Sequence, residues 1–151
     1  MVTVEKLLQA KPERIWTIRP EEFAYDALQI MADNDIGALM VVDEEGGLVG
    51  VFSERDYARK VILKGKSSRV TSVGELMTQA VYYVGLQQTI DECMALMTEK
   101  RIRHLPVIEE GRLIGVVTIG DVVKMIISEQ EVTIKDLETY ITGTSYEAVR
   151  V

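Results

Sequence analysis

Apolar side chains recur every three or four positions over residues 23–34 and again over 89–100, which is the spacing of an amphipathic helix. Each stretch is followed by two short runs of β-branched and other apolar residues with a turn between them, which predicts a β-hairpin. The strands of the two hairpins are expected at 39–43, 48–52, 105–109 and 113–117, with turns at 44–47 and 110–112. A further helix is predicted after each hairpin, over 53–64 and 118–128.

Short apolar segments at 15–18 and 80–84 predict one extra strand before the first helix of each half. Each half then has the order β-α-β-β-α, so the pattern predicts an α/β fold that is built twice. A last short helix is expected over 131–140 with Gly143 as its stop, and the tail 144–151 is expected to be loose.

Two seven-residue segments repeat one arrangement of residue types. Residues 50–56 and 115–121 each hold a glycine, two apolar residues, a hydroxyl residue, two variable residues and an aspartate. The two glycines are 65 positions apart, and so are the two aspartates. Upstream, the segment from Ile36 matches the segment from Ile102 at a spacing of 66, because the second turn is one residue shorter. A repeat that keeps these residue types in register indicates two copies of one small site.

Composition limits the architecture and the partners. A chain of 151 residues forms one ordinary domain or two small ones, and half of it alone would bury too little surface for a stable core. The formal net charge of -7 argues against a nucleic-acid binder, because a phosphate backbone requires a basic surface. No apolar run has the length of a membrane span. We therefore expect neither a nucleic acid nor a membrane as partner.

The start of the chain and its cysteine content indicate a reducing compartment. The first residues lack the apolar core of a secretory signal, and a lone cysteine, Cys93, cannot form an internal disulfide. We expect a cytoplasmic protein, or one of an organellar matrix if a presequence has been removed. Cys93 lies at helical spacing among apolar residues, so we interpret it as core packing and not as a nucleophile.

The aspartates and glycines of the repeated segments could form a nucleotide site. The carboxylates of Asp56 and Asp121 can each accept hydrogen bonds from the two neighbouring hydroxyls of a ribose. Gly50 and Gly115 would let a flat ring approach the backbone closely.

The hydroxyl residues of the same segments have two interpretations. Ser53 and Thr118 stand where a strand turns into a helix, so their hydroxyls and the first free amides could meet a phosphate or sugar oxygen. Their spacing to Asp56 and Asp121 also fits a capping box, in which hydroxyl and acid complete the start of the helix. The residues alone leave both interpretations open.

The stretches before the two hairpins differ in charge. Arg101, Arg103 and His104 precede the second hairpin, and Arg55 lies inside the first repeated segment. Such charges often form a solvated face, but beside a diol-reading aspartate they also suit a sugar phosphate. The matching stretch of the first copy is small and uncharged and could form an apolar wall for a base; it consists of Ile36, Gly37 and Ala38.

Two further features concern stacking and catalysis. Trp16 and Tyr82 match in position, and an aromatic ring there could belong to the core or stack on a purine. With one histidine, no cluster of metal ligands and no activated serine or cysteine, the chain offers no obvious catalytic set, so we do not expect an enzyme.

Together, the doubled β-α-β-β-α order, the doubled Ile-x-x-Leu-x-Val strand and the doubled Gly-to-Asp segment resemble a tandem pair of CBS domains, over about residues 10–130. The resemblance implies two repeats packed sheet to sheet about a pseudo-twofold axis, and a homodimer of such pairs. It places the first repeat at 8–70, the second at 74–130 and a C-terminal tail at 131–151. One departure is Met40, where the family often has the proline that the second copy supplies as Pro106.

The clefts of many CBS pairs bind adenosine-containing ligands, so the resemblance implies AMP, with NAD, ADP, ATP or S-adenosylmethionine as alternatives and no required cofactor. It implies that Asp56 and Asp121 hold riboses, with Arg103 and His104 near a phosphate. The candidate ligand-binding residues are Lys11, Trp16, Ile36, Gly37, Ala38, Gly50, Ser53, Arg55, Asp56, Arg103, His104, Gly115, Thr118 and Asp121, and no metal ligand is expected.

We therefore expect a regulatory module that senses an adenine nucleotide and signals to a partner protein, whose identity the sequence does not indicate. Two alternatives stay open, a structural dimerisation module with vestigial clefts and a nucleotide-processing enzyme. The second helix of each half, near 61–62 and 123–127, could carry the dimer contacts.

Overall fold

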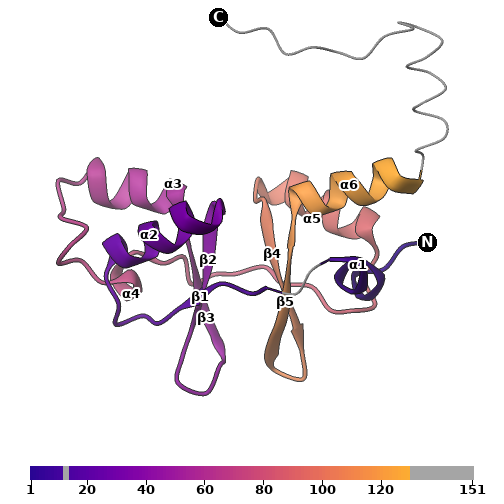
Figure 1. The fold of residues 1–151 in the computed structure, drawn as a ribbon, viewed down its shortest axis with the longest axis horizontal. Coiled ribbons are helices and arrows are strands. Elements are labelled where there is room, and N and C mark those ends of the chain that lie inside the picture. The colour runs from indigo at the N-terminus through magenta and orange to yellow at the C-terminus, as the bar shows by residue number, and fades with distance from the viewer. Residues whose placement is uncertain (12–13, 130–151) are drawn as a thin grey trace, which may run out of the picture.

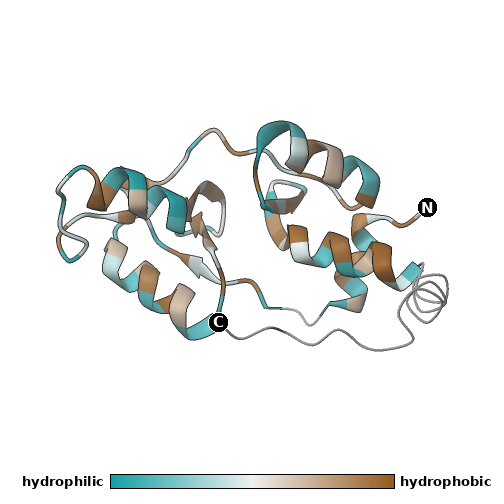
Figure 2. Ribbon diagram, turned by 90° about the horizontal axis from the view of Figure 1, so that it is seen from above, coloured by the Kyte–Doolittle hydropathy of each residue, from teal (hydrophilic) through white to brown (hydrophobic). Residues whose placement is uncertain are grey.

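The computed structural model describes residues 1–11 and 14–129, and the helix and tail expected after residue 130 lie outside this part of the chain. The described residues form two similar halves that lie side by side (Figures 1 and 2). Each half has a small sheet next to the other half and helices on its outer side (Figure 1). This arrangement confirms the predicted α/β fold built from two repeats.

The first half contains a three-stranded sheet. Its elements are β1 (Thr17–Ile18), α2 (Ala24–Asn34), β2 (Ala38–Val42), β3 (Leu48–Ser53), α3 (Glu54–Tyr57) and a π-helical turn, η1 (Ala58–Ile62). Strand β1 runs parallel to β2, and β2 runs antiparallel to β3. Side chains of the sheet and helices, among them Ile18, Met31, Leu39 and Phe52, form a first buried core.

The second half contains a two-stranded sheet. Its elements are α5 (Ile90–Lys100), β4 (His104–Glu109), β5 (Arg112–Thr118) and α6 (Ile119–Glu129). Strand β4 pairs with β5 in antiparallel fashion, and Val84 adds a single parallel bridge to Val107. A second core forms around Met97, Leu105 and Val117.

The sequence repeat is also a repeat of backbone detail. The repeated glycines pair with equivalent valines, Gly50 with Val41 and Gly115 with Val107, and a register shift lies beside this pair in both hairpins. Helices α2 and α5 both end on a left-handed residue, Asp35 with φ 52° and Arg101 with φ 53°. The two halves therefore share one fold down to the irregularities of the chain.

Two short helices cross between the halves. Helix α1 (Val4–Ala10) precedes the first half in the chain but packs into the second core, whereas α4 (Val73–Leu76) precedes the second half and packs into the first core. Their anchoring is equivalent, because the Val4 N–H donates to the Gln88 carbonyl at 2.8 Å and the Val73 N–H donates to the Glu22 carbonyl at 2.8 Å. The sequence pattern predicts neither helix, and together they tie the halves into one unit.

Three segments differ from the expectations. The strand expected at 80–84 is reduced to the bridge at Val84, and residues 80–82 line a pocket between the halves. The strand expected at 15–18 is reduced to β1. The helix expected at 53–64 changes at Ala58 to a π-helix, in which the Leu63 N–H bonds to the carbonyl five residues back, and it ends two residues early.

Cys93 packs in the second core with 0% of its surface exposed, as the sequence indicated. Burial, and after it the charge of Glu92, raises the pKa of the Cys93 thiol to about 11. The thiol is therefore protonated near neutral pH and is a weak nucleophile.

We predict that the packing of α1 against the second half stabilises the second core. Leu7 is 2% exposed, so Leu7→Ala should leave a cavity and lower the free energy of unfolding by about 2–5 kcal/mol. Leu63→Ala, at a leucine that is 76% exposed, is the matched control and should change it by less than about 0.5 kcal/mol. Urea denaturation followed by circular dichroism measures both variants. Equal small effects would show that α1 does not pack on the second half in solution.

Candidate functional site

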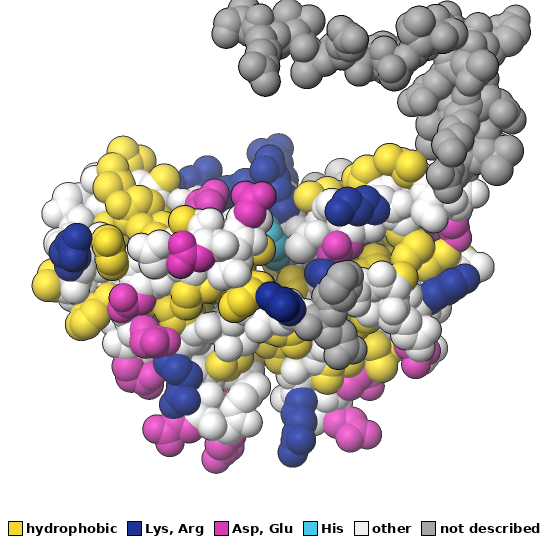
Figure 3. Space-filling model, viewed as in Figure 1, with side chains coloured by type: hydrophobic (Ala, Val, Ile, Leu, Met, Phe, Trp, Pro, Cys, Tyr) yellow, Lys and Arg dark blue, Asp and Glu magenta, His cyan; other side chains and the backbone are white. Residues whose placement is uncertain are grey.

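Two pockets lie between the halves. One has a volume of ≈ 410 Å³ with Asp56 in its wall, and the other has a volume of ≈ 380 Å³ with Asp121 in its wall. We name them the Asp56 cleft and the Asp121 cleft. Gly37, Ala38 and His104 line both, so the clefts meet at the centre of the molecule, where the single histidine is visible between the halves (Figure 3).

All of the candidate ligand-binding residues except two glycines line one of these clefts. The Asp121 cleft contains Lys11, Trp16, Ile36, Gly37, Ala38, His104, Thr118 and Asp121. The Asp56 cleft contains Gly37, Ala38, Ser53, Arg55, Asp56, Arg103 and His104. Arg103 therefore lies in the cleft opposite to that of Asp121, whereas His104 reaches both.

The two exceptions are Gly50 and Gly115, which the chain itself approaches closely. A Cβ at Gly50 would lie 2.6 Å from the Met77 Sδ, and a Cβ at Gly115 would lie 2.9 Å from the Leu8 Cδ1. Both neighbours belong to the segments that cross between the halves. The glycines thus make room for these segments, and the expected approach of a ligand ring is not what requires them.

Asp121 lies in the first turn of α6 and is only partly engaged. Its Oδ2 accepts hydrogen bonds from the Thr118 N–H at 2.9 Å and from Lys11 Nζ at 2.8 Å, and the Asp121 N–H donates to Thr118 Oγ1 at 3.1 Å. Burial opposes ionisation, but the bonds from Lys11 and Thr118 outweigh it and hold the pKa of Asp121 below its usual value. Among the described residues, nothing donates a hydrogen bond to Oδ1 of Asp121.

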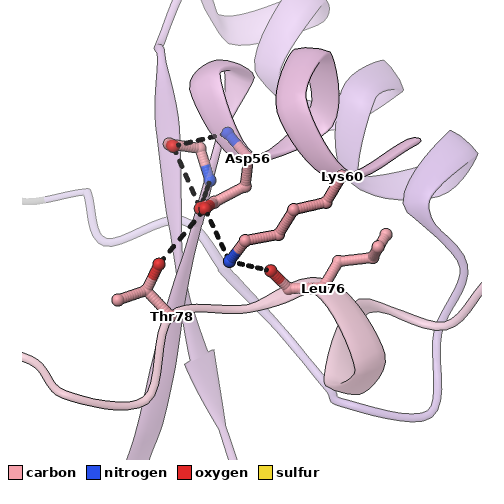
Figure 4. Close-up of polar contacts among 5 residues, drawn as sticks. Asp56, Lys60, Leu76 and Thr78 are labelled. Atoms are coloured by element: carbon pink, nitrogen blue, oxygen red, sulfur yellow. Dashed lines mark hydrogen bonds and ion pairs between the residues drawn. The ribbon is translucent and has the colours of Figure 1, made fainter. Parts of the chain in front are cut away.

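Asp56, in the equivalent turn of α3, is 8% exposed and fully engaged (Figure 4). Its Oδ2 accepts from the Ser53 N–H at 2.9 Å and from Ser53 Oγ at 3.0 Å. Its Oδ1 accepts from Thr78 Oγ1 at 3.1 Å and pairs with Lys60 Nζ at 3.0 Å. The same Lys60 ammonium donates to the Leu76 carbonyl at 2.9 Å.

The two aspartates therefore differ in what they can still accept. The capping box is present at both helices, which bears out one of the two interpretations of these residues. An ionised carboxylate offers about four acceptor positions. The donors of this chain fill all of them on Asp56, but they leave both positions of one oxygen open on Asp121.

His104 stands between the clefts at the start of β4. A Cβ at Gly37 would be 3.7 Å from His104 Cε1, so the imidazole packs against the backbone of the first half. Burial is the main cause that lowers the pKa of His104, and the charges of Lys11 and Arg103 lower it further against the opposing charge of Asp121. No described residue exchanges a hydrogen bond with the imidazole ring, so its nitrogen atoms can meet a ligand.

The two clefts differ in the charges that line them. Arg55, Arg101 and Arg103 line the Asp56 cleft, where Arg55 Nη1 also donates to the Arg101 carbonyl at 3.3 Å. In the Asp121 cleft, Lys11 and Arg14 are balanced by Asp35 and Asp121. Within residues 1–11 and 14–129, no group of three or more His, Cys, Asp or Glu side chains could hold a metal ion. The excess of positive charge lies in the Asp56 cleft, where three arginines face Glu54 and Asp56.

Sequence reasoning missed the residues that hold Asp56. Lys60 follows Asp56 by four positions, a helical spacing at which opposite charges often pair, so this contact could have been anticipated. Thr78 reaches Asp56 from a crossing segment 22 residues further along the chain, and no local pattern indicates such a contact.

The sequence matches a family model. The model for the CBS domain matches residues 2–63 and 73–128. The chain is 41% identical over 127 residues to the CBS domain-containing protein CBSX3, mitochondrial, of Arabidopsis thaliana, a match that covers 82% of this chain. It spans 62% of the length of that plant protein.

Solved structures share the fold. A protein with CBS domains from Burkholderia ambifaria MC40-6 superposes with a TM-score of 0.82 at 52% identity, covering 85% of this chain and 96% of that one. The CBS domain pair of protein MJ0100, in complex with 5′-methylthioadenosine and S-adenosyl-L-methionine, has a TM-score of 0.75 at 24% identity, covering 85% of this chain and 98% of that one. The doubled fold and the doubled site segments agree with these matches, and the chain belongs to the CBS domain family as a tandem pair of CBS domains.

Proposed function

We propose that this CBS pair is a regulatory module that binds an adenosine-containing ligand in the Asp121 cleft. The proposal depends above all on Oδ1 of Asp121, an acceptor oxygen that the described residues leave open in a pocket shared with Lys11 and Trp16. CBS pairs commonly bind adenosine-containing ligands, and the pair solved with two such compounds shows that the fold can hold them.

Each part of an adenosine phosphate has a counterpart in this cleft. The neighbouring ribose hydroxyls would donate to the open oxygen of Asp121. The purine would pack between Trp16 and the apolar side chain of Ile36. The phosphate would meet His104 and the ammonium of Lys11, which has three donors and commits two of them to Asp121 and the Val116 carbonyl.

AMP is the ligand that the cleft favours. A volume of ≈ 380 Å³ lies near the lower end of the range for small-molecule sites, which suits a mononucleotide. The longer candidates ADP, ATP and NAD would have to extend past Gly37 and Ala38 into the Asp56 cleft, where Arg55 and Arg103 could meet further phosphates. S-adenosylmethionine lacks the phosphate that His104 and Lys11 would meet, so it fits this cleft less well.

The module would act on another protein and form a homodimer. Ile62, Val123 and Ile127 are exposed on the outer helices, and hydrophobic side chains lie along the upper edge of both halves (Figure 3). Val61 is fully buried, so it is not part of this surface. No helix in the described ranges has the length and hydrophobicity to cross a membrane. The regulated protein and the location, cytoplasm or organellar matrix, stay predictions.

The two alternative functions, a nucleotide-processing enzyme and a dimerisation module, would require different features in the clefts. An enzyme acting on nucleotides would need an acid bonded to His104 for proton transfer, and no acid among the described residues forms that bond. A dimerisation module with vestigial clefts would need no open acceptor at either aspartate. The open oxygen of Asp121 therefore favours ligand binding over the dimerisation module, and the missing acid at His104 argues against the enzyme.

Asp121→Asn should weaken AMP binding about 10- to 100-fold, because a hydrogen bond to a charged group contributes about 1.5–3 kcal/mol. For the wild-type protein, 3′-deoxyadenosine monophosphate should bind more weakly than AMP, since it lacks one of the two neighbouring hydroxyls. Isothermal titration calorimetry measures both effects. Asp91→Asn is the matched control, because Asp91 is an exposed acid in the first turn of α5 outside both clefts. This variant should bind AMP with the affinity of the wild type.

If the Asp121→Asn protein binds AMP as tightly as the wild type, Asp121 is only a helix cap and the proposed site is wrong. AMP should also raise the melting temperature, because a ligand that binds the folded state stabilises it by mass action. If no adenosine compound at millimolar concentration shifts the melting temperature, the dimerisation module is the better description.

The single histidine should report the phosphate directly. In a tag-free protein we expect the His104 resonance to titrate below its ordinary pKa of 6.5. Between that lowered pKa and 6.5 the unfolded chain binds more protons than the folded one, so this group costs stability as the pH falls through that window. AMP should raise the pKa of His104, because a phosphate stabilises the imidazolium, and adenosine should raise it less.

Nuclear magnetic resonance at a series of pH values measures this shift. The resonance is a cleaner signal than the affinity, because a phosphate monoester itself titrates near pH 6. A His104 pKa that stays constant at saturating AMP would place the phosphate elsewhere.

A further inference from the structure

Lys60 and Thr78 occupy in the first half the aspartate oxygen that stays open in the second, and Lys60 is the charged donor of the two. In both halves Oδ2 of the aspartate caps the helix by accepting the N–H of the residue three positions before it. On Asp56 the other oxygen, Oδ1, receives Lys60 Nζ at 3.0 Å and Thr78 Oγ1 at 3.1 Å (Figure 4). On Asp121 the equivalent oxygen receives no donor from the described chain.

The sequence explains why only the first half has a lysine on the helix that begins at its aspartate segment, four residues after the aspartate. The residue 65 positions after Lys60 is Met125, whose side chain packs against the second core. A thioether donates no hydrogen bond, so α6 supplies nothing equivalent to its own aspartate. Lys60 also lies in the π-helical turn η1, whereas α6 is α-helical throughout, so the two helices differ in geometry as well as in residue type at this point.

We propose that Lys60 is a specificity-determining residue that closes the Asp56 cleft to riboses, so that each chain binds one adenosine-containing ligand. The inference rests on the proposed function, because it assumes that an open aspartate oxygen is what reads the ribose. A ribose at Asp56 would have to displace the Lys60 ammonium from a carboxylate that is 8% exposed. That exchange leaves the ammonium without its carboxylate partner, although it keeps the Leu76 carbonyl, and it replaces an ion pair with a hydrogen bond in which only the acceptor is charged.

The number of ligands per chain tests the role of Lys60, and calorimetric titration with AMP measures it. The wild type should bind one. Lys60→Met introduces the residue type that the second half has at the equivalent position, Met125, and this variant should bind two AMP molecules. Adding Asp121→Asn to Lys60→Met should leave one intact site, now at Asp56. Lys124→Met removes an exposed lysine from α6 and is the matched control, for which we expect one ligand.

Lys60→Ala provides a second opening of the same cleft if the methionine variant folds poorly, and circular dichroism with thermal melting establishes that each variant is folded. A folded Lys60 variant that binds only one AMP would overturn the role of Lys60, and so would two AMP molecules on the wild-type chain. Failure of the proposed function looks different, because Asp121→Asn would then leave the binding of the wild-type protein unchanged. A complete lack of AMP binding would overturn both.

Discussion

The exchange of α1 and α4 between the halves determines what each aspartate contacts. The segment that follows α1 brings Lys11 to Asp121, and the segment that follows α4 brings Thr78 to Asp56. Leu8, inside α1, lies against Gly115, and Met77, directly after α4, lies against Gly50, so a larger side chain at either glycine would collide with it. The repeated glycine and the repeated aspartate therefore serve the same contact. The glycine lets the crossing segment pack on the strand, and the aspartate after that strand accepts a hydrogen bond from the crossing segment.

Because of the pseudo-symmetry, each cleft takes its aspartate from one half and its facing wall from the other. The Asp121 cleft faces the small, apolar stretch from Ile36 to Ala38, which suits a base. The Asp56 cleft faces the basic stretch from Arg101 to His104, which suits phosphates. A duplicated backbone thus holds two chemically different pockets, and His104, which lines both, is placed to respond to charge in either one. The difference between the copies matters for function as much as their likeness does.

Much of the fold could be predicted from local sequence patterns. Helical periodicity and β-branched runs located α2, α5 and both hairpins to within one or two residues, because their buried faces lie within single short segments. The crossing of α1 could not be predicted in this way, since its partners lie more than 80 residues further along the chain. A glycine in a sequence pattern can indicate that another group packs closely against the backbone. The pattern does not show whether this group is a ligand or, as at Gly115, a leucine of the same chain.

The most direct measurement is a crystal structure of the protein with AMP. We predict one nucleotide per chain, with its ribose hydroxyls at hydrogen-bond distance from Oδ1 of Asp121 and with the Lys60 ammonium still on Asp56. A ribose bound to Asp56, or crystals grown with saturating AMP that hold no nucleotide beside Asp121, would contradict this assignment.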